Sequence, residues 1–268
     1  MSGHDAPLVD SHFHVYTTDM PLAKTAWHHP DHDASIEQCL ATLDAHGVTF
    51  GVISAASLYG TYNDYVRQAL RTHKRLRGTA MIDPAWDVYQ LERMRDDGFV
   101  GLRFLWRPLE EIPDLGSESY RRLLRRCADL GWHIHLTDRP HRIDATIRAI
   151  EAAGVRVVLD HIGLIDTEAG IDDPGFRAIL AAIERGRTWV KLSAGFRFRQ
   201  PGLADRCAAA LVAAGGWDRL VWASDWPFAG FEGTVGYADT VEALKRWVPD
   251  IGMRHAVGGR TPLKLYFT

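Results

Sequence analysis

The sequence predicts a single-domain α/β fold, a (β/α)8 barrel that extends over residues 1–268. Short apolar segments alternate with segments of helical periodicity, the apolar segments number eight, and a glycine follows five of the helical segments. Continuous apolar segments are typical of parallel strands, which are buried on both faces. Eight repeats in a chain of this length favour closure into a barrel.

The strand candidates begin with Leu8–Val9, which leads towards His12. The others are Phe50–Ser54, Leu76–Ile82, Phe99–Phe104, Trp132–Leu136, Val155–Leu159, Thr188–Leu192 and Leu220–Ala223. Apolar residues spaced three or four apart predict helices that end before Gly47, Gly98, Gly131, Gly154 and Gly186. The alternative, an open doubly wound sheet, usually has a glycine-rich loop after its first strand, and none follows here. Three loops after strand candidates, Tyr16–Asp33, Trp106–Ser117 and Ala194–Pro201, are predicted to line an active-site mouth.

Composition excludes several classes of protein. A net charge of −3 gives no basic surface for nucleic acid, and no apolar segment is long enough to cross a membrane. The first seven residues do not resemble a signal peptide. Three distant cysteines, all in predicted helices, do not indicate a disulfide framework. We therefore expect a cytoplasmic protein, either a monomer or a homodimer.

Two pairs of histidines lie two residues apart in strand candidates. His12 and His14 end the first strand, and both imidazoles point the same way because side chains alternate along a strand. Such a pair can hold a metal ion or bind an anionic or carbonyl group, although two unrelated surface histidines would give the same spacing. His133 and His135 lie in the fifth strand, where they face the lumen or form a pair in the packed core.

A histidine and an aspartate end two later strands. His161 follows the sixth strand candidate, and taken alone it is as consistent with a histidine bonded to a nearby carbonyl. Asp225 follows the eighth, beside tryptophans that make its charge costly unless a histidine cluster or a metal pairs with it. Because parallel strands deliver their carboxyl ends to one rim, we expect His12, His14, His161 and Asp225 to converge there.

Cationic residues form a second group. Arg103 lies inside the fourth strand candidate, Arg107 follows it, and Arg197 and Arg199 follow the seventh. An arginine in an apolar strand needs an anionic partner, which is either a structural carboxylate or that of a substrate. Lys191, in the seventh strand, is predicted to point inwards, and a buried ion pair is the simplest explanation for it. These residues predict a small anionic substrate.

The order of these segments resembles the amidohydrolase superfamily, in its amidohydrolase-2 branch. The His-x-His pair, the strand-five histidine, Asp160–Gly163 and Ala223–Pro227 carry the resemblance. Residues 57–63, 77–84, 98–104 and 190–193 narrow it to the 2-pyrone-4,6-dicarboxylate lactonase group and relatives that open muconolactones and sugar lactones. Tyr62 precedes Asn63 where relatives often have aspartate, which leaves the exact lactone open.

The resemblance, which extends over nearly the whole chain, implies hydrolysis of a small carboxylated lactone. Asp225 would activate a water molecule and later protonate the leaving oxygen, while His12, His14 and His161 would polarise the carbonyl. Residues implied to bind the substrate are Arg103, Arg107, Arg197 and Tyr59.

The resemblance leaves the metal content open. Metal-dependent members have a histidine where His135 stands, so one expectation is a single Zn²⁺ or other divalent ion held by His12, His14, His135 and Asp225. The dicarboxylate lactonase is thought to work without metal, so metal-free catalysis is the other expectation. A binuclear centre is not expected, because Arg103 stands on the strand that would carry a bridging carboxylated lysine.

Two other functions are considered. A metal-dependent non-oxidative decarboxylase of an aromatic or unsaturated acid would use His135 as a metal ligand and His161 as a general acid. A non-catalytic binding protein could use the same barrel, but the apparently complete set of rim residues argues against it.

Overall fold

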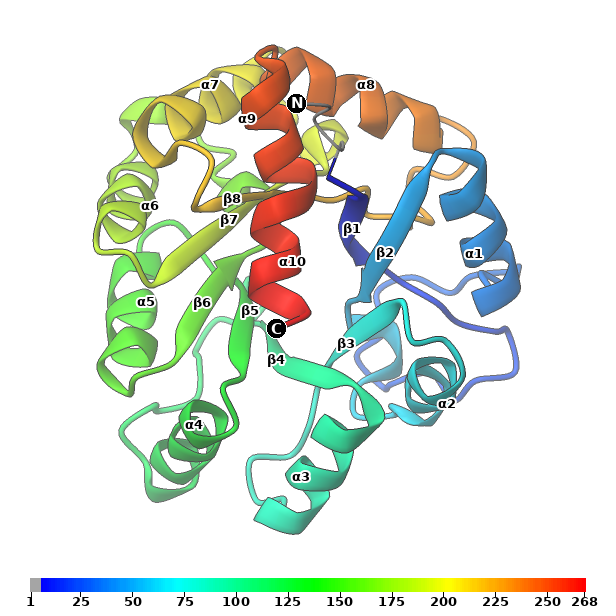
Figure 1. The fold of residues 1–268 in the computed structure, drawn as a ribbon. Helices are drawn as coiled ribbons and strands as arrows, with labels where there is room; N and C mark the ends of the chain where they lie inside the picture. The colour runs from blue at the N-terminus through cyan, green and yellow to red at the C-terminus, as the bar shows by residue number, and fades with distance from the viewer. Residues whose placement is uncertain (1–5) are drawn as a thin grey trace.

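Eight parallel strands form one sheet in chain order, ringed by helices (Figure 1). The computed structural model describes residues 6–268, so most of the segment examined for a signal peptide lies outside the described residues. The strands are β1 (Leu8–Phe13), β2 (Val48–Ile53), β3 (Leu76–Ala80), β4 (Phe99–Leu105), β5 (His133–Thr137), β6 (Arg156–Leu159), β7 (Thr188–Leu192) and β8 (Leu220–Trp222). The predicted (β/α)8 barrel is confirmed, with strand ends shifted by a few residues.

One helix follows each strand. The helices are α1 (Ile36–Ala45), α2 (Asp64–Thr72), α3 (Val88–Asp97), α4 (Glu118–Asp129), α5 (Ile143–Ala152), α6 (Pro174–Glu184), α7 (Leu203–Gly215) and α8 (Tyr237–Trp247), and two short ones follow, α9 (Ile251–His255) and α10 (Thr261–Tyr266). Helix α3 begins with a capping box between Asp87 and Gln90, and it ends at Gly98, where φ is 112°. The other four glycines expected to end helices also have positive φ.

Backbone hydrogen bonds join the end of β1 to the segment after β8 and close the barrel. The amide of Asp225 donates to the carbonyl of His12 at 2.8 Å, and the amide of His14 donates to the carbonyl of Trp226 at 2.8 Å. The open sheet considered as an alternative is therefore wrong. The closure places His12, His14 and Asp225 at one point, although they lie at opposite ends of the sequence.

A packed layer fills the lumen near the amino ends of the strands. Val52, Val158 and Val221 come from β2, β6 and β8, and they pack against Leu265 and Tyr266 of α10. Side chains from alternate strands form such layers in barrels of this type. Helix α10 crosses this end of the barrel (Figure 1), so the carboxyl ends of the strands are left for a site.

The three cysteines lie in α1, α4 and α7, as expected, and all are buried free thiols. Burial raises the pKa of the Cys127 thiol to about 12. Within residues 6–268, no helix has the length and apolar character needed to cross a membrane.

Substitution of Gly101 in β4 tests how closely β4 packs against the neighbouring strand β5. An added Cβ would fall against the backbone carbonyl of His133, closer than van der Waals contact. We predict that Gly101→Ala lowers the free energy of unfolding by about 2 kcal/mol or more, because backbone atoms must move. Gly252→Ala in α9 is the control, since its Cβ would meet only Asp250 Oδ1, at 3.4 Å. Urea denaturation of both variants checks this, and equal stabilities would contradict it.

Candidate active site

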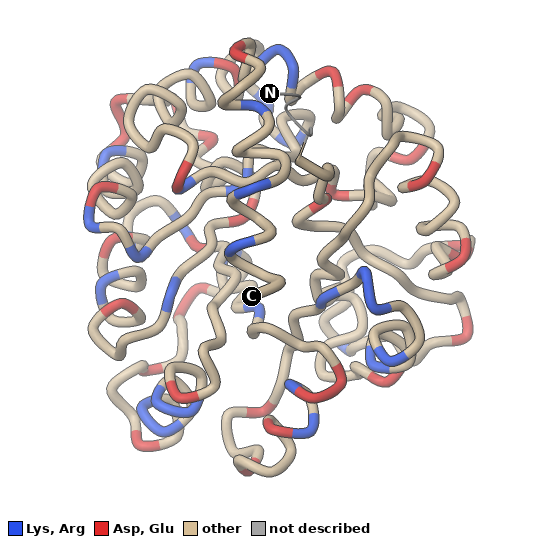
Figure 2. Tube along the Cα trace, viewed as in Figure 1, with Lys and Arg blue, Asp and Glu red and all other residues tan. Residues whose placement is uncertain are grey.

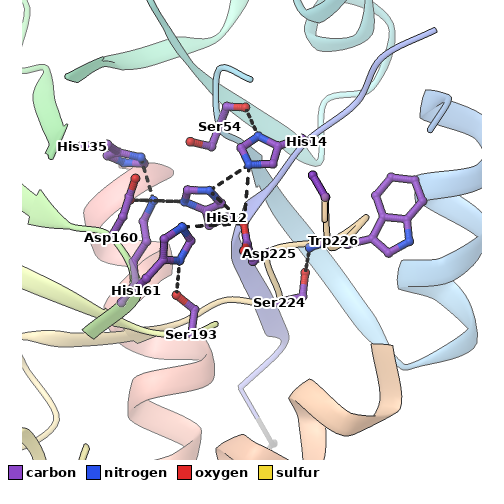
Figure 3. Close-up of polar contacts among 12 residues, drawn as sticks. His12, His14, Ser54, His135, Asp160, His161, Ser193, Ser224, Asp225 and Trp226 are labelled. Atoms are coloured by element: carbon purple, nitrogen blue, oxygen red, sulfur yellow. Dashed lines mark hydrogen bonds and ion pairs between the residues drawn. The ribbon is translucent and has the colours of Figure 1, made fainter. Parts of the chain in front are cut away.

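Three imidazoles surround one carboxylate oxygen at the carboxyl end of the barrel (Figure 3). The Nε2 atoms of His12 and His14 each lie 3.5 Å from Asp225 Oδ1, and Nε2 of His161 lies 3.7 Å from it. His12 belongs to β1, whereas the other three follow β1, β6 and β8. The four residues expected to converge therefore do so.

Two of the imidazoles are fixed by contacts at Nδ1, the ring nitrogen that does not face Asp225. His14 Nδ1 lies 2.8 Å from the carbonyl oxygen of Ser54, and His161 Nδ1 lies 3.0 Å from Ser193 Oγ. The backbone turns sharply after β6, where His161 and the β-branched Ile162 have φ of 54° and 58°. Positive φ is rare for such residues and concentrates at functional sites, where the surrounding structure maintains it.

A buried carboxylate braces the strand ends that carry His12 and Asp225. Asp10 Oδ1 accepts hydrogen bonds from the amides of His12, at 3.1 Å, and Ser224, at 3.0 Å. Asp10 Oδ2 accepts from the hydroxyls of Ser224 and Tyr237. Burial raises the pKa of Asp10 to about 6, against the effect of these donors. Asp10 directly follows the first strand candidate, and residue order alone does not reveal its four donors.

Asp225 is buried and ionised. Burial raises its pKa, but interaction with His161 and with the guanidinium of Arg197 holds the pKa of Asp225 well below the usual value. Arg197 Nε donates to Oδ2 at 2.7 Å, which leaves Oδ1 directed towards the histidines. Burial lowers the pKa of His161 to about 4, so this imidazole is neutral at pH 7. The site therefore combines an anionic oxygen with a neutral proton carrier, as acid–base chemistry requires.

A second buried carboxylate, Asp160, pairs with the inward-pointing cations. Lys191 Nζ lies 2.8 Å from Asp160 Oδ1, and Arg103 Nε donates to Oδ2 at 3.1 Å. Burial raises the pKa of Asp160, but Lys191, His12 and Arg103 outweigh it and keep the pKa well below its usual value. The buried ion pair expected for Lys191 is present. Arg103 also donates to the carbonyl of Ala55, at 2.8 Å, so two of its nitrogens are committed to protein acceptors.

A cavity of about 290 Å³ is lined by His14, His161 and Asp225. Each of the three loops expected at the mouth also contributes to its lining. Among its lining residues, Arg107, Tyr16 and Thr137 carry buried polar atoms, Nη1, the phenol oxygen and Oγ1, that have no hydrogen-bond partner within residues 6–268. Buried polar groups normally have partners, so unpaired ones facing a cavity indicate a polar ligand. Arg197 also lines the cavity.

Two residues singled out in the sequence lie elsewhere. Tyr59 is buried in a small apolar cluster against Tyr16, and it does not belong to the cavity lining, where Tyr16 stands instead. His135 Nδ1 lies 2.8 Å from Lys191 Nζ, and its ring stacks on His133 deeper in the lumen. It is not among the grouped ligand atoms around Asp225. Three of the four residues expected to hold a metal are therefore grouped, and His135 is not grouped with them.

The remaining three residues of that set fit a divalent ion. The ligand atoms of His12, His14 and Asp225 all lie within 4.8 Å of one another. Two imidazoles and a carboxylate are a donor set that catalytic zinc uses. The contact of His14 with the Ser54 carbonyl is of the kind that orients metal-binding imidazoles. His12, Asp160 and His161 form a second group of the same kind.

A barrel that delivers histidines and an aspartate from its first, sixth and eighth strands to one cavity defines a hydrolase of the amidohydrolase type. Comparison of the sequence with family models agrees, because the amidohydrolase model matches residues 9–268. The chain belongs to this family, as the resemblance predicted.

Its relatives include enzymes that act on lactones. The chain is 26% identical over 267 residues to the 4-sulfomuconolactone hydrolase of Rhizobium radiobacter, an alignment covering 96% of this chain and 89% of that one. Two solved structures of probable 2-pyrone-4,6-dicarboxylic acid hydrolases are also similar. The Acinetobacter baumannii protein, with citric acid bound, has a TM-score of 0.92 and 27% identity, covering 97% of this chain and 99% of its own. The Pseudomonas putida protein has a TM-score of 0.90 and 32% identity, covering 98% of each.

The grouped ligand atoms yield a prediction about metal binding. We predict that His14→Ala weakens binding of Zn²⁺ about tenfold or more, because one of three ligands is lost. His135→Phe is the matched control, and it should change the affinity much less. Competition with a chelating dye measures both constants. A larger loss with His135→Phe than with His14→Ala would contradict the assignment.

Proposed function

We propose that the protein hydrolyses a small carboxylated lactone, using Asp225 as the base that activates water. The observation that carries this proposal is the position of Asp225 Oδ1 among three histidine Nε2 atoms, in a cavity that is also lined by Arg107, whose Nη1 has no hydrogen-bond partner within residues 6–268. The similarity to enzymes named as sulfomuconolactone and pyrone dicarboxylic acid hydrolases supports the same substrate class.

The reaction uses water and one lactone. Asp225 Oδ1 takes a proton from water as the water oxygen bonds to the lactone carbonyl carbon. His12 and His161 lie beside the developing negative charge on the carbonyl oxygen, whereas His14 contacts the Ser54 carbonyl through Nδ1 and presents an acceptor at Nε2. The bond between the carbonyl carbon and the ring oxygen then breaks, and Asp225 returns its proton to that oxygen. The product is an open-chain hydroxy acid, or its keto form where the ring oxygen belonged to an enol.

Arg197 keeps the base in position. Its Nε bonds to Oδ2 of Asp225, so only Oδ1 faces the reacting water. A divalent ion, where one is bound, would be held by His12, His14 and Asp225 and would supply Lewis-acid polarisation of the carbonyl or of the water.

Arg107 is the residue best placed to receive a substrate carboxylate. Arg103 and Arg197 are engaged by Asp160 and Asp225, whereas Arg107 Nη1 has no partner within residues 6–268. Tyr16 and Thr137 add hydroxyl groups on the same cavity. A cavity of about 290 Å³ suits a single ring with its substituents.

The decarboxylase alternative has less support. It required His135 as a metal ligand, and His135 is not among the ligand atoms grouped around Asp225. A cytoplasmic location remains part of the proposal, and the buried free thiols are compatible with it.

A lactone panel tests the proposed reaction. We expect purified protein, with and without added Zn²⁺, to open carboxylated lactones of the pyrone dicarboxylate, muconolactone or sugar-acid type faster than unsubstituted butyrolactone, as followed by proton release. Asp225→Asn should retain the fold by circular dichroism but lose at least about a thousandfold in turnover, because the base is absent. An inert wild-type protein, or a fully active Asp225→Asn variant, would refute the proposal.

Arg107→Met tests carboxylate recognition. A charge-assisted hydrogen bond contributes roughly 1.5–3 kcal/mol, so we expect KM to rise about 10- to 100-fold with a smaller change in kcat. Arg148→Met is the control, because Arg148 forms an exposed pair with Asp144 on α5 and lies outside the cavity lining. An unchanged KM for Arg107→Met would assign the carboxylate to another residue.

A further inference from the structure

Lys191 lies at the centre of a buried polar network below the proposed active site. Its side chain is fully buried in the lumen, and its Nζ lies 2.8 Å from Asp160 Oδ1, 2.9 Å from His12 Nδ1 and 2.8 Å from His135 Nδ1. An ammonium group has three N–H donors and no acceptor. Three acceptors at hydrogen-bond distance therefore match its full donor capacity.

The contact with Lys191 favours one tautomer of His12, in which Nδ1 accepts and Nε2 carries the hydrogen. If Lys191 donates to Nδ1, the neutral ring of His12 carries its hydrogen on Nε2, which lies 3.2 Å from His14 Nε2. His14 Nδ1 lies 2.8 Å from the Ser54 carbonyl, which can only accept, so His14 carries hydrogen on Nδ1 and has a lone pair on Nε2. From Lys191 through His12 and His14 to Ser54, every donor then meets an acceptor, while Asp160 Oδ1, 3.2 Å from His12 Nδ1, is bonded by Lys191 instead.

A divalent ion at His12, His14 and Asp225 requires the other tautomer. Binding through His12 Nε2 needs a lone pair there, so the hydrogen must move to Nδ1. Asp160 Oδ1 lies 3.2 Å from Nδ1 and could accept it, as carboxylates do behind metal-binding imidazoles. In that state, however, an N–H of Lys191 would point at the N–H of His12 across 2.9 Å. Two donors facing each other at this distance oppose the metal-binding tautomer.

We propose that Lys191 is a positioning residue that holds His12 in the Nε2–H tautomer and so weakens the affinity of the His12–His14–Asp225 group for divalent ions. His135 has a supporting role, because it accepts the third hydrogen and keeps the ammonium in place. The inference rests on that group as the metal-binding set. It explains why the strand-five histidine lies close to the site without joining the ligands.

Zinc affinity of Lys191→Met tests the proposal without reference to activity. Methionine is unbranched and one atom shorter than lysine, so it removes the donor with little change of shape, while Arg103 still pairs with Asp160. We expect Zn²⁺ to bind Lys191→Met about tenfold more tightly than wild type in competition with a chelating dye. Lys245→Met, which removes an exposed lysine paired with Glu242, should bind as wild type does. Binding no tighter in Lys191→Met than in wild type would overturn the proposal.

Nitrogen NMR of the wild-type protein gives a second readout, which stands even if Lys191→Met does not fold. In the metal-free protein we expect the His12 resonances, identified by their loss in His12→Gln, to show hydrogen on Nε2 and a lone pair on Nδ1. Hydrogen on Nδ1 instead would overturn the proposal. Both measurements are independent of lactone hydrolysis, so a failed substrate panel would leave this inference intact.

Discussion

The carboxylate of Asp10 links the first and last strands of the barrel, and the geometry of the site depends on that link. Its oxygens accept from two backbone amides and two hydroxyls, and the residues that supply the amides, His12 and Ser224, lie in or next to the site. Since the amide of Asp225 also donates to the carbonyl of His12, the base and the histidines are fixed by the closure of the sheet. A buried carboxylate with four donors is stable only in this closed form.

Charge balance in the lumen is the second constraint. Asp160 is shared by Lys191 and Arg103, and Asp225 is paired with Arg197. Removing Asp160 would leave the buried cations Lys191 and Arg103 without that carboxylate, which costs several kcal/mol. The lumen is therefore an ordered set of donors and acceptors, and the proposed reaction uses Asp225 Oδ1, which lies among the imidazoles of His12, His14 and His161. Figure 2 shows the rest of the acidic and basic residues interspersed along the outer helices, in keeping with a modest net charge.

Much of this arrangement could be predicted from the sequence. Alternating apolar and helical segments predicted the barrel, and the ends of strands predicted the meeting of His12, His14, His161 and Asp225, because parallel strands impose a common rim. What could not be predicted is the choice of partner. His135 was expected at a metal but contacts Lys191, and Tyr59 was expected in the cavity where Tyr16 lies. Side-chain pairing across the lumen depends on tertiary distances of a few ångströms, which residue order does not determine.

The closure described for β1 and β8 also bears on how the chain is made. Asp10 and Ser224 are 214 residues apart, so a growing chain exposes the edge of β1 until nearly all of the barrel has emerged from the ribosome. The residues of α10 that pack against the valine layer of the lumen are synthesised later still. Unpaired strand edges and open apolar interiors promote association between nascent chains. These surfaces are buried only once β8 and α10 have been synthesised, so slow translation of the segment from β7 to α10 would prolong their exposure.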